Sequence, residues 1–125
     1  MKKLGINIIL FFIALLLLCT VGVYGLFYTL ISSIFKYNKI SFIEYWTKLF
    51  YSINIGIDQL GNVTLAAFLN RYTIKTKEHL FGNVKHTISY VLAVNYFNNN
   101  LKILGKILVW ILNYIDKDHM KKSLF

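Results

Sequence analysis

The chain has 125 residues, of which 57% are hydrophobic and 17% aromatic, and its 14 Lys and Arg residues against 5 Asp and Glu give a net charge of +9. Its single cysteine, Cys19, cannot form an intramolecular disulfide, which argues against a small secreted domain stabilised by disulfides. No dense run of basic residues and no basic–aromatic motif points to nucleic acid, so we expect the basic surplus to face anionic lipid head groups and expect no nucleic-acid partner.

The first third of the chain is dominated by one apolar stretch. Leu4–Phe35 contains 32 residues without an Asp, Glu, Lys, Arg or His. A transmembrane helix needs about 20 such residues to cross roughly 30 Å of hydrocarbon. The apolar run of a signal peptide is shorter, about 7 to 15 residues, so an uncleaved anchor is favoured over a cleaved signal. We therefore predict a transmembrane anchor over residues 1–36. Gly22 and Gly25 lie in its second half, and small residues let such helices pack closely, so a homo-oligomer formed through the anchor is an open alternative.

Residues 37–125 are predicted to form a small, basic, mostly helical domain close to the membrane. Ser41 and Glu44 have the spacing of a capping box, which favours a helix start there. Apolar residues recur at helical intervals after this point. Residues 72–95 are the least regular part, where a short hairpin is an alternative to helix. The predicted fold class is all-α, with a single N-terminal transmembrane helix before the domain.

The last predicted element is an amphipathic helix over residues 101–115. Its apolar side chains are spaced three and four residues apart. Only nine residues separate Lys106 from Asp116, which is too short a span to cross a bilayer. Two placements remain open. The helix either packs on the domain or lies in the membrane interface with Trp110 and Tyr114 at head-group depth.

A row of polar side chains marks the helix predicted around residues 53–69. Asn54, Asp58 and Asn62 are four residues apart, so they lie on one helical face, with Gln59 beside them. A carboxylate among apolar residues must either face water or find a partner. This row is therefore the best candidate for a polar site, but a helix with one solvated face is favoured over it.

Three separated segments resemble segments of small, uncharacterised proteins encoded by tailed phages and prophages. Gly56–Asn62 resembles their "LDQLGN" segment, and Phe81–Leu92 resembles their "FGNxxETISSVLG" segment. Ile115–Ser123 is similar to their "IDxDHCxKS" ending. The likeness covers residues 53–123 in order, and the predicted anchor lies outside it. The resemblance implies a phage or prophage context, with no assigned activity.

The resemblance directs attention to one set of polar residues. These are Asp58, Gln59, Asn62, His86, Thr87, Ser89, Asp118 and His119. The chain departs from the family pattern, because His86 replaces a Glu and Met120 replaces a Cys, so a zinc or nucleophilic site that needs a thiolate is lost. Asp58, His86 and His119 leave open a metal set of two histidines and one carboxylate. A buried polar network that fixes helix packing is favoured over it, and we predict no bound metal or cofactor.

The expected function is that of a phage-type or prophage-type accessory protein, without enzymatic activity, acting through contacts at the bacterial inner membrane. A holin-like lysis protein is one alternative. A membrane-tethered, metal-dependent hydrolase using Asp58, Asn62, His86 and His119 is another. Lysines flank the anchor on both sides and nearly balance, but their surplus after the anchor favours a single-pass protein with a cytoplasmic domain.

Overall fold

The computed structural model describes residues 2–125, and it shows the all-α fold that the sequence predicts. The helices in chain order are α1 (Lys2–Leu17), the π-helical turn η1 (Leu18–Gly22), α2 (Val23–Lys36), α3 (Lys39–Thr64), α4 (Ala66–Tyr72), α5 (Ile88–Phe97), α6 (Ile103–Ile115) and α7 (His119–Lys122). The chain forms two compact units, with the boundary between Lys48 and Leu49. The predicted boundary between residues 36 and 37 coincides with the end of α2, whereas the units meet within α3.

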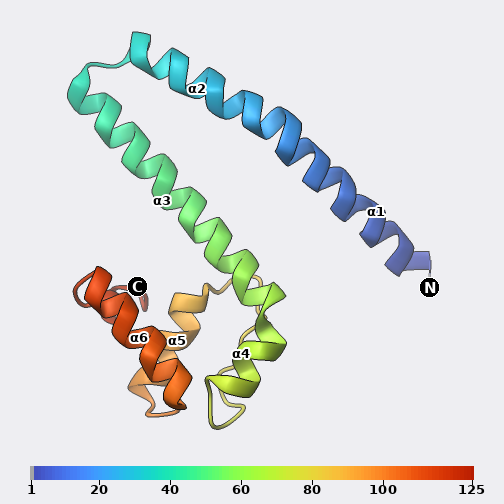
Figure 1. Cartoon of the computed structure of the whole chain (residues 1–125), viewed down its shortest axis with the longest axis vertical. Coiled ribbons are helices and arrows are strands. Elements are labelled where there is room, and N and C mark those ends of the chain that lie inside the picture. Colours follow the sequence, from blue (N-terminus) through green and yellow to red (C-terminus); the bar gives the residue numbers. More distant parts are fainter. Residues whose placement is uncertain (1) are drawn as a thin grey trace. The chain divides into compact units, whose positions relative to one another are not determined.

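The N-terminal unit is built around one continuous run of helix made by α1, η1 and α2 (Figure 1). Lys3–Lys36 spans 34 residues, with a mean hydropathy of 2.8 over its most apolar window, and none of that window is buried. By length and composition this helix can cross a membrane. At the π-helical turn the Thr20 hydroxyl donates to the carbonyl oxygen of Leu16 at 2.8 Å, so its polar group is satisfied within the helix.

The start of α3 differs from the capping-box prediction. The side chain of Asn38 caps this helix, because its Oδ1 accepts a hydrogen bond from the backbone N–H of Ser41 at 2.9 Å. Ser41 therefore lies in the first turn of α3 and is not the residue before the helix. Within the same unit the indole N–H of Trp46 donates to the buried Ser33 hydroxyl at 3.1 Å, which ties the first turns of α3 to the end of α2.

The C-terminal unit contains the hydrophobic core. The core side chains come from α4 to α7 and from the segments between them: Leu69, Ile74, Phe81, Val91, Leu92, Ala93, Leu101, Val109 and Met120. Helix α5 is the most enclosed element, with four buried residues in ten. It begins where Thr87, in an extended conformation, accepts a hydrogen bond from the N–H of Tyr90 through its side chain. This cap explains why a β-branched segment that also suited a strand becomes helix.

The region from Thr73 to Thr87 has no helix, and the hairpin alternative for residues 72–95 is not observed. Within residues 2–125 the one isolated bridge pairs Ile74 with Leu101. The N–H of Lys75 donates to the carbonyl of Asn100 at 2.9 Å, and that of Lys102 donates to the carbonyl of Thr73 at 2.8 Å. Because Leu101 is extended in this bridge, α6 begins at Ile103, two residues later than predicted.

Candidate functional site

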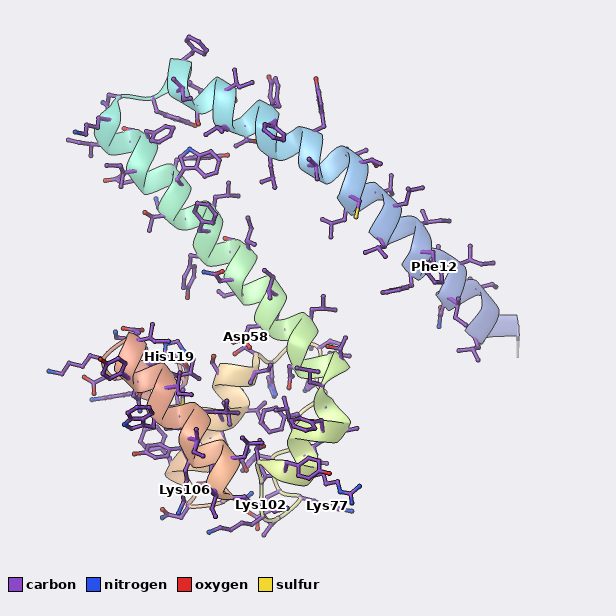
Figure 2. The ribbon with its side chains drawn as sticks, viewed as in Figure 1. Phe12, Asp58, Lys77, Lys102, Lys106 and His119 are labelled. Carbon is purple, nitrogen blue, oxygen red and sulfur yellow. The ribbon has the colours of Figure 1, made fainter. Side chains whose placement is uncertain are left out.

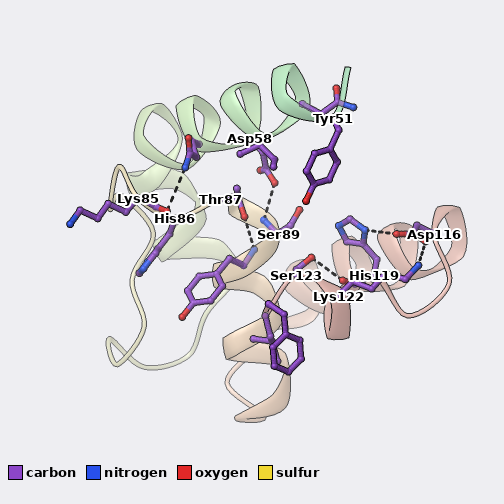
Figure 3. Close-up of a pocket in the computed structure, with 16 residues that line it drawn as sticks. Tyr51, Asp58, Lys85, His86, Thr87, Ser89, Asp116, His119, Lys122 and Ser123 are labelled. Atoms are coloured by element: carbon purple, nitrogen blue, oxygen red, sulfur yellow. Dashed lines mark hydrogen bonds and ion pairs between the residues drawn. The ribbon is translucent and has the colours of Figure 1, made fainter. Parts of the chain in front are cut away.

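A cavity of about 910 Å³ lies in the C-terminal unit, between α3, the start of α5 and the C-terminal residues (Figure 3). Six of the eight residues predicted as a polar site line it: Asp58, Gln59, His86, Thr87, Ser89 and His119. The fold thus brings together residues that are up to 61 positions apart in the sequence (119 − 58). The two others, Asn62 and Asp118, do not line the cavity.

Asp58 is the carboxylate at the centre of this region. Its Oδ1 accepts a hydrogen bond from the backbone N–H of Ile88 at 2.9 Å, and its Oδ2 accepts one from the N–H of Ser89 at 3.3 Å. These are the first two residues of α5, whose N–H groups have no partner inside the helix. A negative charge at this end also interacts favourably with the helix dipole. Asp58 therefore holds the start of α5 in place.

Asn62 lies one turn further along α3 and is completely buried. Its side-chain amide donates to the carbonyl oxygens of Asn83 at 2.8 Å and His86 at 2.9 Å, and its Oδ1 accepts from the N–H of Gly82 at 3.2 Å. The segment turns here because Gly82 has a φ of 116°, which favours glycine. Asp58 and Asn62 of the polar row on α3 thus bind the backbone of residues 82–89. Gln59 adds a long contact of 3.5 Å to the carbonyl of Lys85.

Three further asparagines, which were not among the predicted site residues, bind the backbone of the preceding residues 76–81. Asn70 pairs with the backbone of Phe81, accepting from its N–H at 2.8 Å and donating to its carbonyl at 3.1 Å. Asn95 donates to the carbonyl of His79 at 2.9 Å, and Asn100 binds Asn95 and Thr76. Asn95 and Asn100 are both buried. An asparagine inside the apolar run of α5 was the one sequence signal for this role, since a buried amide requires partners.

His119 forms the other side of the cavity with Asp116. Its Nδ1 lies 3.1 Å from Oδ2 of Asp116, and Oδ1 of the same carboxylate accepts from the Lys122 ammonium. The hydrogen bond from Lys122, followed by the one from His119, lowers the pKa of the Asp116 carboxyl below its ordinary value. The Nε2 atom of His119 is buried without a partner in the described chain. Asp118, with a φ of 62°, forms the left-handed turn before α7.

The arrangement does not match a metal site or a nucleophilic centre. Within residues 2–125 no group of three His, Cys, Asp or Glu side chains is placed to hold a metal ion, so Asp58, His86 and His119 do not form the set considered above. The ring of His86 packs on Tyr90, with centroids 4.6 Å apart. Ser89 and His119 line one cavity, but the helix N-terminus that would stabilise an oxyanion already binds the Asp58 carboxylate.

Asp58→Ala is expected to lower the free energy of unfolding of the full chain in detergent by about 1 to 2 kcal/mol, because it removes a cap from α5. Asp58→Asn keeps the acceptor for one of the two backbone N–H groups and loses the other acceptor and the charge, so a smaller loss than for Asp58→Ala is expected. The charge alone is worth roughly 0.3 to 1 kcal/mol. Chemical unfolding followed by circular dichroism measures both. Asn54→Ala, an exposed polar residue one turn earlier on α3, is the matched control. Equal stability of the Asp58→Ala and Asn54→Ala variants would contradict the capping role.

No protein-family model, curated protein or solved structure matches this chain. The resemblance of residues 53–123 to small phage proteins therefore stays a prediction that rests on the sequence motifs. The geometry adds a physical role for several residues of those motifs. Asp58 and Asn62 of the first segment bind the backbone of the second, and Asn62 does so from complete burial.

Proposed function

We propose that this chain is a membrane-anchored, non-enzymatic accessory protein of phage or prophage type, which acts by binding other components at the bacterial inner membrane. One observation carries the proposal. Two of the predicted site residues, Asp58 and Asn62, bind the backbone of residues 82–89, so their hydrogen-bonding capacity serves the fold. What the chain then presents to its surroundings is a potential anchor and a small basic domain.

The anchor is supported by the exposure of the first helical run. Its large apolar side chains are exposed along its whole length, including Phe12 at 61% and Phe27 at 62%. A soluble helix of this length hides one apolar face against a core, whereas the most apolar part of this helix is not buried at all. A helix that is apolar on all sides is stable in lipid, because its backbone N–H and C=O groups form hydrogen bonds within the helix.

A cytoplasmic position of the C-terminal unit is part of the proposal. Lys36, Lys39 and Lys48 follow the predicted span, against Lys2 and Lys3 before it. Basic residues in short flanking segments favour the cytoplasmic side. The one cysteine, Cys19, lies within the helical run and not in the domain, so the domain does not depend on an oxidising compartment.

Fractionation of a bacterium that expresses the full chain with a C-terminal tag tests the proposal. We expect the uncleaved chain in the inner-membrane pellet after an alkaline wash, released only by detergent. In intact spheroplasts the tag should resist external protease, and permeabilisation should expose it. A soluble full-length product, or a product shortened by its N-terminal third, would overturn the anchor. Digestion of the tag in intact spheroplasts would place the domain outside.

The same culture separates the proposal from a lysis function. We expect the membrane potential, followed with a voltage-sensitive dye, to stay constant during expression. Abrupt depolarisation after a lag would replace the accessory role with a holin-like one.

A further inference from the structure

Helix α6 has two different apolar faces. The inner face buries Gly105 and Val109 against the core. The outer face carries six exposed apolar side chains: Ile103, Ile107, Trp110, Ile111, Tyr114 and Ile115. The exposed fractions are 79% for Ile103, 67% for Trp110 and 80% for Tyr114. The rings of Trp110 and Tyr114 stack with centroids 5.8 Å apart. We call these six residues the outer face of α6. A contiguous exposed apolar face of this kind marks a contact surface.

A cluster of exposed cations adjoins this face. The bridge between Ile74 and Leu101 brings two distant segments together, and with them the five residues of a cationic cluster: Arg71, Lys75, Lys77, Lys102 and Lys106. The ammonium of Lys102 donates to the carbonyl of Arg71 at 2.6 Å, and that of Lys75 donates to the carbonyl of Asn99 at 3.1 Å. Figure 2 shows Lys77, Lys102 and Lys106 along the same end of the C-terminal unit.

Two lysines of the cluster adjoin the outer face of α6. Lys102 immediately precedes α6, and Lys106 lies one turn later, beside Ile103 and Ile107 on the helix. Between residues 70 and 106 the sequence contains a single acidic residue, Glu78. The surface therefore combines an apolar stripe with aromatic rings and a strongly positive flank.

We propose that the outer face of α6, together with the cationic cluster, lies on an anionic phospholipid bilayer, with Trp110 and Tyr114 at head-group depth. Apolar side chains beside lysines are the pattern of helices that lie in the plane of a membrane. Trp and Tyr favour the boundary between hydrocarbon and water because their rings are amphipathic. Lysines on the flank meet the negative head groups. The inference rests on the membrane anchoring proposed above, which keeps a bilayer permanently within reach of the domain.

Charge favours a bilayer over a second copy of the chain. In a two-fold dimer formed by this surface each copy would present the same face to the other. The partner surface would then offer cations to the cationic cluster and only Glu78 from the same stretch of chain as an acid. A membrane with anionic lipid offers complementary charge over the whole surface.

Fluorescence of Trp110 in the full chain tests the inference. The chain has two tryptophans, so Trp46→Phe leaves Trp110 as the single reporter. This variant is reconstituted in nanodiscs made with phosphatidylglycerol or with phosphatidylcholine alone, and with brominated acyl chains as the quencher. In the anionic discs we expect blue-shifted emission, strong quenching by the brominated lipid and weak quenching by acrylamide. High salt and neutral discs should reduce the lipid quenching at least twofold.

Two matched pairs of substitutions distinguish the effect of the cationic cluster from the effect of the net charge of the chain. Lys77→Gln with Lys106→Gln removes two charges from the cationic cluster and should reduce lipid quenching in the anionic discs. Lys117→Gln with Lys121→Gln removes two exposed charges beyond the end of α6 and should leave it unchanged. Equal effects of both pairs would overturn the role of the cluster.

Three further outcomes exclude the bilayer as the occupant, and a fourth refutes the anchoring on which the inference rests. Acrylamide quenching that is strong and equal in both kinds of disc would show that the face stays in water. Protection from acrylamide without quenching by brominated lipid would assign the face to a second copy. Protection that appears only after adding duplex DNA would assign it to nucleic acid. A chain that fails to enter nanodiscs and stays in the aqueous fraction would refute the proposed anchoring itself.

Discussion

Asn62→Ala is expected to lower the free energy of unfolding of the C-terminal unit by roughly 2 to 4 kcal/mol, since a backbone group that loses its partner away from water costs about 1 to 3 kcal/mol. The substitution leaves the N–H of Gly82 and the carbonyl of His86 without their side-chain partner, whereas the carbonyl of Asn83 keeps the N–H of His86. Because Asn62 is fully buried, water cannot replace these contacts without opening the structure. Denaturant unfolding in detergent, followed by circular dichroism, measures the loss.

Gln59→Ala is the matched control for Asn62→Ala. Gln59 lies on the same helix and contacts the same segment, but its hydrogen bond to the carbonyl of Lys85 is long, at 3.5 Å. We expect a change within about 0.5 kcal/mol, the usual range for a substitution outside the core. Limited proteolysis provides a local readout, because the Asn62→Ala chain should be cut between residues 73 and 87 first. Equal stability of the two variants would show that the amide of Asn62 is not what holds this segment.

Gly105→Ala is expected to destabilise the same unit by about 1 to 3 kcal/mol, because a methyl group must be forced into a closely packed space. A Cβ atom at this position would lie 2.6 Å from the carbonyl oxygen of Thr73 and 2.9 Å from a methyl group of Leu101. The Thr73 carbonyl already accepts a hydrogen bond from the N–H of Lys102, so it cannot move without loss. Thermal unfolding in detergent measures the effect.

The sign of the effect separates packing from helix propensity. Gly56→Ala in α3 is the control, since nothing lies within 4 Å of its added Cβ. There the substitution should stabilise the helix by up to about 1 kcal/mol. Opposite signs at the two glycines are therefore expected. A Gly105→Ala chain as stable as the unaltered chain would mean that α6 can move away from the Ile74–Leu101 bridge.

The helices that are determined by the pattern of hydrophobic residues alone could be predicted from the sequence. The long N-terminal helix is determined by a run of apolar residues without charge, and α6 by its three-and-four spacing. The start of α3 was predicted three residues too late, because two capping signals compete. Asn38 and Ser41 are both good caps, and the local sequence does not show which one the chain uses.

The candidate site shows why side-chain roles are harder to predict than helices. The shared face of Asp58 and Asn62 follows from their spacing of four. Their partners do not, since these are backbone groups 20 to 31 residues away in a segment without periodicity. Asn70 and Asn100 had no local signal that separated them from ordinary loop or helix-end asparagines. Their roles depend on the path of residues 73–87, which the core determines.

The hydrogen bonds from α3 to the second segment also constrain the order in which the chain can assemble. Most helical proteins fold quickly because their contacts are local, whereas contacts of large sequence separation must first close a loop. Asp58 meets the N–H of Ile88 across 30 residues. Asp58 therefore stays without this partner until the segment that contains Ile88 has also left the ribosome. Until then the C-terminal half of α3 exposes both its apolar side chains and its unpaired polar groups. The nascent domain is therefore most vulnerable to aggregation and to proteases during that interval.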